Sequence, residues 1–195
     1  MASVTTVDLI ALLESCGAVL RGHFRLASGR HSDVYVEKFR ILERPPVLEA
    51  AVAAIIAGLG GMKPTLVVGP STGGMIVAYE AARQLDLTAA YVELVEGKRA
   101  LRRNGHIAPD ARVLLVDDVL TTGTSLVETA EVVHAAGATL VGVGVLIDRS
   151  EACPDFGCPV VSACRFDARS YAEDDLPDWL AAIPLTTPGT RARLV

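Results

Sequence analysis

The stretch VLLVDDVLTTGTSL, from Val113 to Leu126, decides the fold of this chain. Its four leading apolar residues, Val113–Val116, are typical of a strand that is buried on both faces of a sheet. Two acids, Asp117 and Asp118, follow directly, and residues 121–125 then consist of threonine, glycine and serine. Apolar residues return after them with the spacing of a helix. The stretch therefore predicts a core strand, a polar joint and a helix.

The segments on either side repeat this alternation of strand and helix. Apolar runs are joined by short connections to stretches with helical spacing, which indicates a parallel sheet covered on both faces. The expected strands are residues 65–68, 89–95, 113–116 and 139–147, and the expected helices are residues 47–59, 73–85 and 124–136. We predict an α/β fold with a doubly wound, mainly parallel sheet flanked by helices.

The region before this core has a different pattern. Residues 4–16 have the spacing of an amphipathic helix, which Gly17 ends. From residue 18 to residue 42 the pattern alternates and is broken by glycines, which predicts short antiparallel strands. Two prolines, Pro45 and Pro46, then open the next helix. We expect a small N-terminal hood in front of the core.

The last segment and the composition support a single domain. Residues 174–195 contain one short helical candidate around Trp179 and otherwise predict a strap. We find no repeat and no linker, so residues 1–195 are expected to form one domain. The 195 residues are 51% hydrophobic, which is enough for a sizeable core. A formal net charge of −5 argues against sequence-independent binding of nucleic acid.

Two further expectations concern the compartment. No apolar segment approaches the roughly 20 residues that cross a bilayer, and the first residues lack the pattern of a signal peptide. We therefore expect a cytoplasmic protein with no membrane partner. The cysteines follow neither a CxxC pair nor a Cys/His ligand spacing, which favours reduced thiols over zinc or disulfides. They are Cys16, Cys153, Cys158 and Cys164.

The polar joint after the central strand has the character of a phosphate site. In doubly wound sheets, ligands bind beyond the carboxyl ends of the strands, where a following helix presents unpaired N–H groups. Gly123 lets the backbone curl, and the hydroxyls at positions 121, 122, 124 and 125 add donors. Neither the Walker pattern nor GxGxxG occurs in the chain, which argues against ATP and dinucleotides. The joint predicts a pocket for a phosphate monoester.

The adjacent acids indicate what the phosphate is attached to. Asp117 and Asp118 are placed to hold Mg²⁺ or to accept hydrogen bonds from neighbouring hydroxyls of a ribose. A ribose whose 5-phosphate lies in the joint explains the acids and the hydroxyls together. The alternative is that the acids only cap the following helix, but one acid would suffice for that, and a buried pair is costly.

The whole stretch resembles the phosphoribosyl pyrophosphate (PRPP) signature of the type I phosphoribosyltransferases. The resemblance implies that the two acids face the ribose hydroxyls and that residues 121–125 hold the 5-phosphate. The PRPP-binding residues that it implies are Asp117, Asp118, Val119, Leu120, Thr121, Thr122, Gly123, Thr124 and Ser125.

A second joint follows the expected strand at 65–68, in the stretch VVGPSTGG. Its glycines expose backbone N–H groups at the start of a helix, which suits the pyrophosphate of PRPP with its Mg²⁺. Taken alone, the pattern also fits an ordinary tight turn. Beside the first joint it resembles the pyrophosphate loop of the family, which implies that Ser71, Thr72 and Gly73 contact PRPP.

Other segments resemble one branch of the family, the orotate phosphoribosyltransferases. Residues 22–39, GHFRLASGRHSDVYVEKF, are similar to the hood of those enzymes, and TTPGT near the end is similar to their closing segment. The resemblance implies that Arg149, directly after the strand VGVGVLID, binds the orotate carboxylate through a bidentate salt bridge. The alternative is a surface salt bridge between Arg149 and Asp148. The implied base-binding residues are Tyr35, Val36, Thr121 and Arg149.

A basic stretch lies between the expected strands at 89–95 and 113–116. By itself it fits a solvated hairpin. Its position beside the acids instead suggests cations that close over pyrophosphate as it leaves, with the first two as the catalytic pair: Lys98, Arg99, Arg102 and Arg103. The stretch departs from the Arg-Lys-x-x-Lys-Asp-His-Gly loop of many orotate enzymes, and Ala27 and Thr72 stand where well-studied members have lysines.

The resemblance implies an enzyme that transfers the 5-phosphoribosyl group from PRPP to orotate, giving orotidine 5′-monophosphate and pyrophosphate in the synthesis of UMP. It further implies Mg²⁺ held mainly by PRPP rather than by protein side chains, and a homodimer with shared active sites. Two alternatives stay open: a phosphoribosyltransferase for another base, and a regulator that binds PRPP without catalysis. A regulator would need a DNA-reading element, and no basic helix-turn-helix pattern precedes the core.

Overall fold

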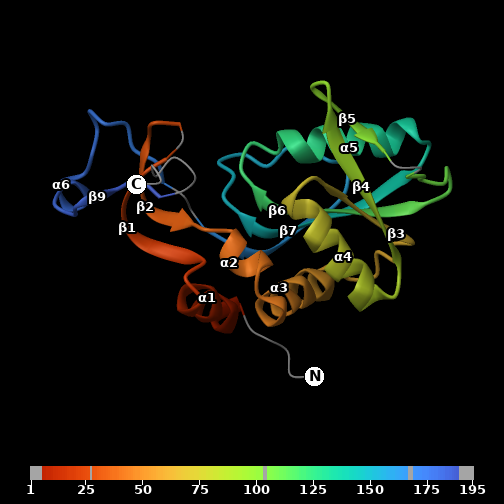
Figure 1. Ribbon diagram of the computed structural model, residues 1–195, viewed down its shortest axis with the longest axis horizontal. Coiled ribbons are helices and arrows are strands. Elements are labelled where there is room, and N and C mark those ends of the chain that lie inside the picture. The colour runs from red at the N-terminus through yellow and green to blue at the C-terminus, as the bar shows by residue number, and fades with distance from the viewer. Residues whose placement is uncertain (1–5, 27, 103–104, 167–168, 189–195) are drawn as a thin grey trace.

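A six-stranded sheet forms the centre of the computed structural model, which describes residues 6–26, 28–102, 105–166 and 169–188 (Figure 1). The strands lie in the order β5-β4-β3-β6-β7-β8, and all neighbours are parallel except the β4–β5 hairpin. This confirms the predicted doubly wound, mainly parallel sheet. The bounds are β3 (Leu66–Pro70), β4 (Thr88–Val95), β5 (Lys98–Leu101), β6 (Arg112–Leu120), β7 (Thr139–Asp148) and β8 (Val160–Arg165).

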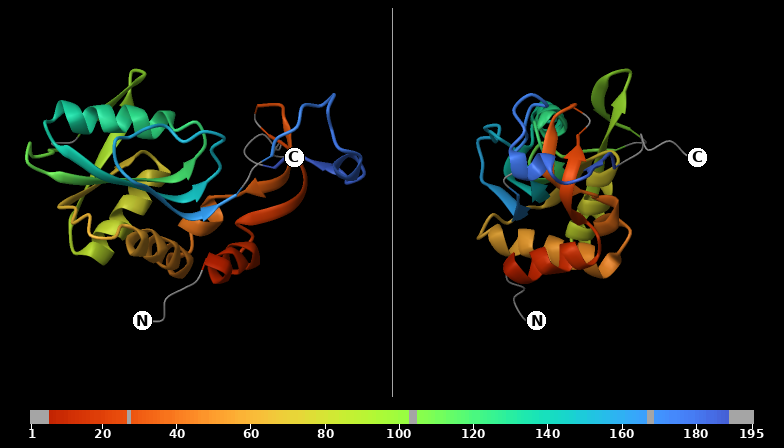
Figure 2. Two further views of the ribbon diagram at one scale, coloured as in Figure 1. Left: turned by 180° about the vertical axis from the view of Figure 1, so that it is seen from behind. Right: turned by 90° about the vertical axis from the view of Figure 1, so that its left-hand side faces the viewer.

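Helices cover both faces of this sheet, as Figure 1 and the left view of Figure 2 show. On β6, Leu114 and Val116 belong to the apolar cluster under α1, α3 and α4, whereas Val113 and Leu115 belong to the cluster under α5. Successive side chains of a strand point to opposite faces, so a continuous apolar run fills both clusters. None of the helices in the described ranges is long and apolar enough to span a membrane. The bounds are α1 (Thr6–Ser15), α3 (Pro45–Gly58), α4 (Gly73–Leu85) and α5 (Thr124–Ala135).

Strand β6 is longer than the sequence predicts, because it continues through the two acids to Leu120. Its backbone stays paired with β7 over this extension, with Val119 opposite Ile147. Backbone pairing does not depend on the polarity of the side chains, so the strand runs on after the apolar residues end. The two acids therefore lie within a strand rather than in the joint that follows it.

Two strands of the sheet are not among those expected from the sequence. Strand β5 lies in the basic stretch and forms an edge hairpin with β4, while β8 forms the opposite edge beside β7. Both are only partly buried. They lack the continuous apolar run by which the central strands are recognised.

The hood lies at one end of the molecule and combines segments that are far apart in the sequence (Figures 1 and 2). Strands β1 (Val19–Arg25) and β2 (His31–Val36) form the expected antiparallel hairpin, and the short strand β9 (Leu185–Thr186) adds to β1 in parallel. The helix expected around Trp179 is α6 (Asp178–Ala181). Residues at the end of the predicted hood form a helical turn instead of a strand, α2 (Phe39–Leu42).

Two buried histidines tie the C-terminal strap to this hairpin. Nδ1 of His23 lies 3.0 Å from the carbonyl oxygen of Ile183. A carbonyl can only accept, so Nδ1 of His23 donates this hydrogen bond. Nε2 of His23 lies 2.7 Å from Nδ1 of His31, so the strap and both strands of the hairpin are joined through these two rings.

The strap is also held by one apolar side chain, which provides a test. Leu180 of α6 is fully buried, whereas Leu185 of β9 is 49% exposed. We expect Leu180→Ala to weaken the attachment of the strap by about 2 to 4 kcal/mol, because it leaves a cavity. Limited proteolysis followed by mass spectrometry should then show faster cleavage within residues 171–188. Leu185→Ala is the matched control, and equal cleavage of the two variants would contradict the anchoring role of Leu180.

Candidate active site

The two joints predicted to bind ligands lie together at the carboxyl ends of β3 and β6. Helix α4 begins at Gly73, directly after the first joint, and α5 begins at Thr124, directly after the second. A Cβ atom added to Gly74 would lie 3.0 Å from Oδ1 of Asp117, so the first turn of α4 touches the end of β6. Two helix N-termini with unpaired N–H groups therefore face one small region.

The acid pair is buried in this region. Asp117 and Asp118 are 8% and 4% exposed, and the backbone N–H of Asp118 donates to Oδ1 of Asp117 at 2.8 Å. A Cβ atom on Gly73 would overlap with Oδ2 of Asp118. Only glycine leaves room for the carboxylate against the start of α4. The positive end of the helix dipole thus partly offsets the charge of the acids.

Two cations also act on the acids. Nζ of Lys38, which lies between β2 and α2, is 2.8 Å from Oδ2 of Asp118. Burial, and then repulsion from Asp118, raise the pKa of Asp117 to about 7, while Asp118 N–H and the charges of Lys38 and Arg99 oppose this rise. The site therefore holds one carboxyl group that gains a proton close to neutral pH.

The raised pKa of Asp117 makes the stability of the free protein depend on pH. In the unfolded chain the carboxyl loses its proton near its ordinary pKa of 3.8, but in the folded protein only near about 7. The folded state therefore binds more protons between these values, and its stability falls as pH rises through them. We expect Asp117→Asn to stabilise the protein at pH 8 by roughly 2 to 4 kcal/mol, and progressively less as pH falls toward 4.

This dependence is measured by urea denaturation between pH 4 and 8 without added Mg²⁺ or phosphates. The amide introduced by Asp117→Asn keeps an oxygen that can accept from the N–H of Asp118, so the variant changes the charge alone. Exposed Asp110→Asn is the control. If the difference in free energy of unfolding between variant and wild type does not grow with pH, the ionisation of Asp117 does not destabilise the folded protein.

The second joint encloses a cavity of about 60 Å³ whose size and lining suit a tetrahedral anion. Gly123, with φ of 77°, adopts a left-handed conformation that glycine favours and precedes the first turn of α5. The hydroxyls of Thr122 and Thr124 lie 3.0 Å apart at its rim. The lining residues are Asp117, Val119, Thr121, Thr122, Gly123, Thr124, Ser125 and Leu126. All residues predicted from this stretch lie here except Leu120, whose side chain is in the core, and Asp118, which lies against α4.

Arg99 joins the two joints. Its guanidinium donates to the backbone oxygen of Ser71 at 3.3 Å and to Oγ of Ser125 at 3.1 Å, and its Nε faces Glu128 of α5 at 3.4 Å. Its side chain is only 11% exposed. The predicted cation therefore lies on strand β5 between the two joints, where Ser71, Ser125 and Glu128 hold its guanidinium.

The other cations of the basic stretch lie differently. Lys98 precedes Arg99 on β5 and is exposed. Arg102 lines a separate cavity of about 490 Å³ along β4, with Tyr91 and His106. Arg103 lies outside the described residues. Of the predicted cations that the structure describes, Arg99 is the one that contacts residues of both joints.

Arg149 follows β7 at the same end of the sheet. Its Nε is buried and has no hydrogen-bond partner among the described residues. Burial lowers the pKa of Arg149, and Tyr35 opposes this shift. The alternative salt bridge with Asp148 is wrong, because that carboxylate pairs with Arg165 at 3.0 Å and accepts from Ser150. Arg149 is thus a half-buried cation for which the described residues provide no salt bridge.

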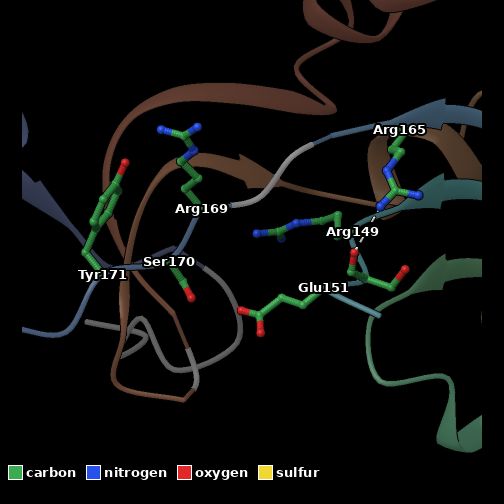
Figure 3. A pocket seen from close by; sticks show the side chains of 7 residues that line it. Arg149, Glu151, Arg165, Arg169, Ser170 and Tyr171 are labelled. Atoms are coloured by element: carbon green, nitrogen blue, oxygen red, sulfur yellow. Dashed lines mark hydrogen bonds between the residues drawn. The ribbon is translucent and has the colours of Figure 1, made fainter. Parts of the chain in front are cut away.

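Figure 3 shows Arg149 extending into a cavity of about 550 Å³ between the core and the segment that leads to the hood. Tyr35 is half-buried, and its charge interaction with Arg149 places it near this guanidinium. Val36 instead points into the core, so only its backbone can face a base. The residues that line the cavity are Arg149, Ser150, Glu151, Arg165, Arg169, Ser170 and Tyr171.

Sequence reasoning overlooks two charged residues of the site, Lys38 and Glu128. Neither belongs to a motif, and each reaches the site only through packing between segments that are distant in the chain. Of the first joint, Ser71 accepts from Arg99 and Gly73 adjoins Asp118, while Thr72 is exposed at the start of α4. The two joints, the acids and Arg149 lie close together because they follow or end the neighbouring strands β3, β6 and β7.

The fold and these two loops define a phosphoribosyltransferase. The sequence model of the phosphoribosyl transferase domain matches residues 40–155, which include both loops, the acids and Arg149. Orotate phosphoribosyltransferase of Pelotomaculum thermopropionicum is 39% identical over 188 residues, covering 96% of this chain and 99% of its own. That of Maricaulis maris is 38% identical over 191 residues, covering 96% and 98%. The crystal structure of orotate phosphoribosyltransferase from Aeropyrum pernix superposes with a TM-score of 0.70 at 33% identity, covering 81% of this chain and 93% of that one. The chain therefore belongs to the orotate phosphoribosyltransferase family.

Proposed function

We propose that the protein transfers the 5-phosphoribosyl group from PRPP to N1 of orotate, giving orotidine 5′-monophosphate and pyrophosphate on the route to UMP. The observation that carries the proposal is the buried acid pair between two glycine-containing loops. At the end of the next strand, Nε of Arg149 has no hydrogen-bond partner among the described residues. The family membership reported above supports the same reaction.

The phosphate groups of PRPP are assigned to the two loops. The cavity of residues 121–126 takes the 5-phosphate through hydroxyls and the N–H groups at the start of α5. Ser71, Thr72 and Gly73 take the pyrophosphate at the start of α4. Mg²⁺ enters with PRPP and is held mainly by its oxygens, where it neutralises charge on the pyrophosphate. No protein side chain is assigned to the ion.

The acids are assigned to the ribose. As pyrophosphate leaves, the anomeric carbon gains positive character, and an ionised acid pair close to the ring stabilises that charge more than it stabilises the ground state. Arg99 stabilises the opposite charge, which develops on the departing pyrophosphate, from its place between the loops. Lys98 is assigned to the outer side of the pyrophosphate, whereas Arg102, which lines the separate cavity along β4, is not.

The base is assigned to the side of the hood. The guanidinium of Arg149 forms a bidentate pair with the orotate carboxylate, which supplies a counter-charge that the described residues do not provide. Tyr35 and the backbone at Val36 face the pyrimidine from β2, and Thr121 faces it from the phosphate loop. The carboxylate contact separates orotate from bases that have no acidic group.

We also propose that the enzyme is a cytoplasmic homodimer with shared sites. Several large apolar side chains are exposed along α2, α4 and β4, which supports an interface there; they are Phe39, Ile76, Tyr79 and Leu94. All four cysteines are free, in keeping with a reducing compartment.

The reaction is tested by incubating the protein with PRPP, Mg²⁺ and a panel of nucleobases, and by separating the products chromatographically. We expect loss of orotate and equimolar formation of its nucleotide and pyrophosphate. Turnover of a purine or of uracil in place of orotate would indicate a transferase for another base. Binding of PRPP without turnover of any base would indicate a regulator.

Arg149→Ala tests the assignment of the base. Loss of a bidentate contact with a carboxylate costs about 2 to 3 kcal/mol, so KM for orotate should rise roughly thirty- to a hundredfold. KM for PRPP should change much less. Arg21→Ala, which removes an exposed arginine from β1, is the control. Equal effects of Arg149→Ala on the two KM values would contradict base recognition by this residue.

Arg99→Ala tests the assignment of the cation. Because Arg99 acts on charge that develops as pyrophosphate leaves, its loss should lower the maximal rate at saturating substrates by at least about tenfold, or roughly 1.4 kcal/mol of barrier. Lys98→Ala, on the same strand but exposed, should lower it less. The assignment fails if Arg99→Ala keeps the wild-type rate within about twofold, which is the range of ordinary surface changes.

A further inference from the structure

Lys38 connects the hood to the acid pair. It lies two residues after β2 and directly before α2. Its Nζ reaches Oδ2 of Asp118 at 2.8 Å, while the side chain of Asp118 is only 6% exposed. This pair is therefore not an ordinary surface salt bridge, because one partner is an acid inside the core.

The ammonium group of Lys38 is the direct counter-charge of Asp118. Oδ2 of Asp118 lies against Gly73 and receives no hydrogen bond from the described residues, so the ion pair with Lys38 is the polar contact that they give it. Arg99, the other cation close to the acids, is already engaged by Ser71, Ser125 and Glu128. Removal of the Lys38 charge would leave a buried carboxylate without a partner.

Each acid has one oxygen held by the protein. Oδ1 of Asp117 accepts the backbone N–H of Asp118, and Oδ2 of Asp118 is held by Lys38. The remaining oxygens, Oδ2 of Asp117 and Oδ1 of Asp118, accept no hydrogen bond from any described residue. Two oxygens on neighbouring residues are thereby left to accept from two neighbouring hydroxyls.

We propose that Lys38 is a positioning residue that turns the carboxylate of Asp118 so that Oδ1 receives a hydroxyl of the ribose. The proposal rests on the assignment of the acids to the ribose in the proposed function. It adds that the hood aligns the acid that faces the sugar, through a lysine in the connection between β2 and α2.

The test compares two ligands that differ in one hydroxyl. Calorimetry gives the dissociation constants of ribose 5-phosphate and 2-deoxyribose 5-phosphate, without a base, for the wild type, Lys38→Met and Lys38→Arg. The wild type should bind the ribose compound about tenfold more tightly. Lys38→Met should bind both about equally, and Lys38→Arg, which keeps the charge, should restore most of the preference.

Controls separate positioning from a loss of structure. Lys63→Met replaces an exposed lysine before β3, at the opposite end of the strand from the site, and should keep the wild-type preference. Affinity for inorganic phosphate, which needs only the loop at 121–125, should be the same in all variants. If Lys38→Met does not fold, Lys38→Gln takes its place.

The outcomes distinguish this proposal from the one on which it rests. A wild type that binds neither sugar phosphate, or binds both equally, overturns the assignment of the acids to the ribose and this inference with it. A wild type that prefers ribose 5-phosphate, together with a Lys38→Met variant that keeps the full preference, overturns only the role of Lys38.

Discussion

Two neighbouring carboxylates buried at the end of a core strand require compensating positive charge from the rest of the structure. Their mutual repulsion strengthens as water is removed, so positive charge has to reach them through protein. The first turn of α4 supplies it from one side, Lys38 from the hood, and Arg99 from the edge hairpin. Because these three come from different parts of the chain, the acids are balanced only when the whole fold is assembled.

The two ends of the site use different chemistry for their ligands. The loops offer mostly neutral donors, namely hydroxyls and backbone N–H groups at helix starts, which suit phosphate oxygens. The end between the core and the hood offers Arg149, a half-buried charged group whose Nε has no hydrogen-bond partner among the described residues. Neutral donors suit groups common to every PRPP-dependent reaction, whereas a desolvated charge discriminates between bases, since the wrong base leaves it unpaired.

Local patterns are sufficient to predict the central part of the fold and the joints, because apolar runs, glycines and hydroxyls are local signals. The helix at 73–85 begins and ends as predicted, and the acids, both loops and Arg149 meet at one end of the sheet. Features that depend on partners distant in the chain escape sequence reasoning. Strands β5 and β8 exist through pairing at the edges, and Lys38 carries no motif. The partner of Asp148 is likewise hidden, because Arg165 meets it only across the β7–β8 pair.

The mixed origin of the hood has a consequence for the protein as it is synthesised. Both loops, the acids and Arg149 lie before residue 150, whereas α6 and β9, which complete the hood sheet, lie after residue 177. A ribosome therefore releases both loops and the acids before β9 can pair with β1. Growing chains pass through a stage in which the core and its loops can be formed but the hood still lacks its third strand.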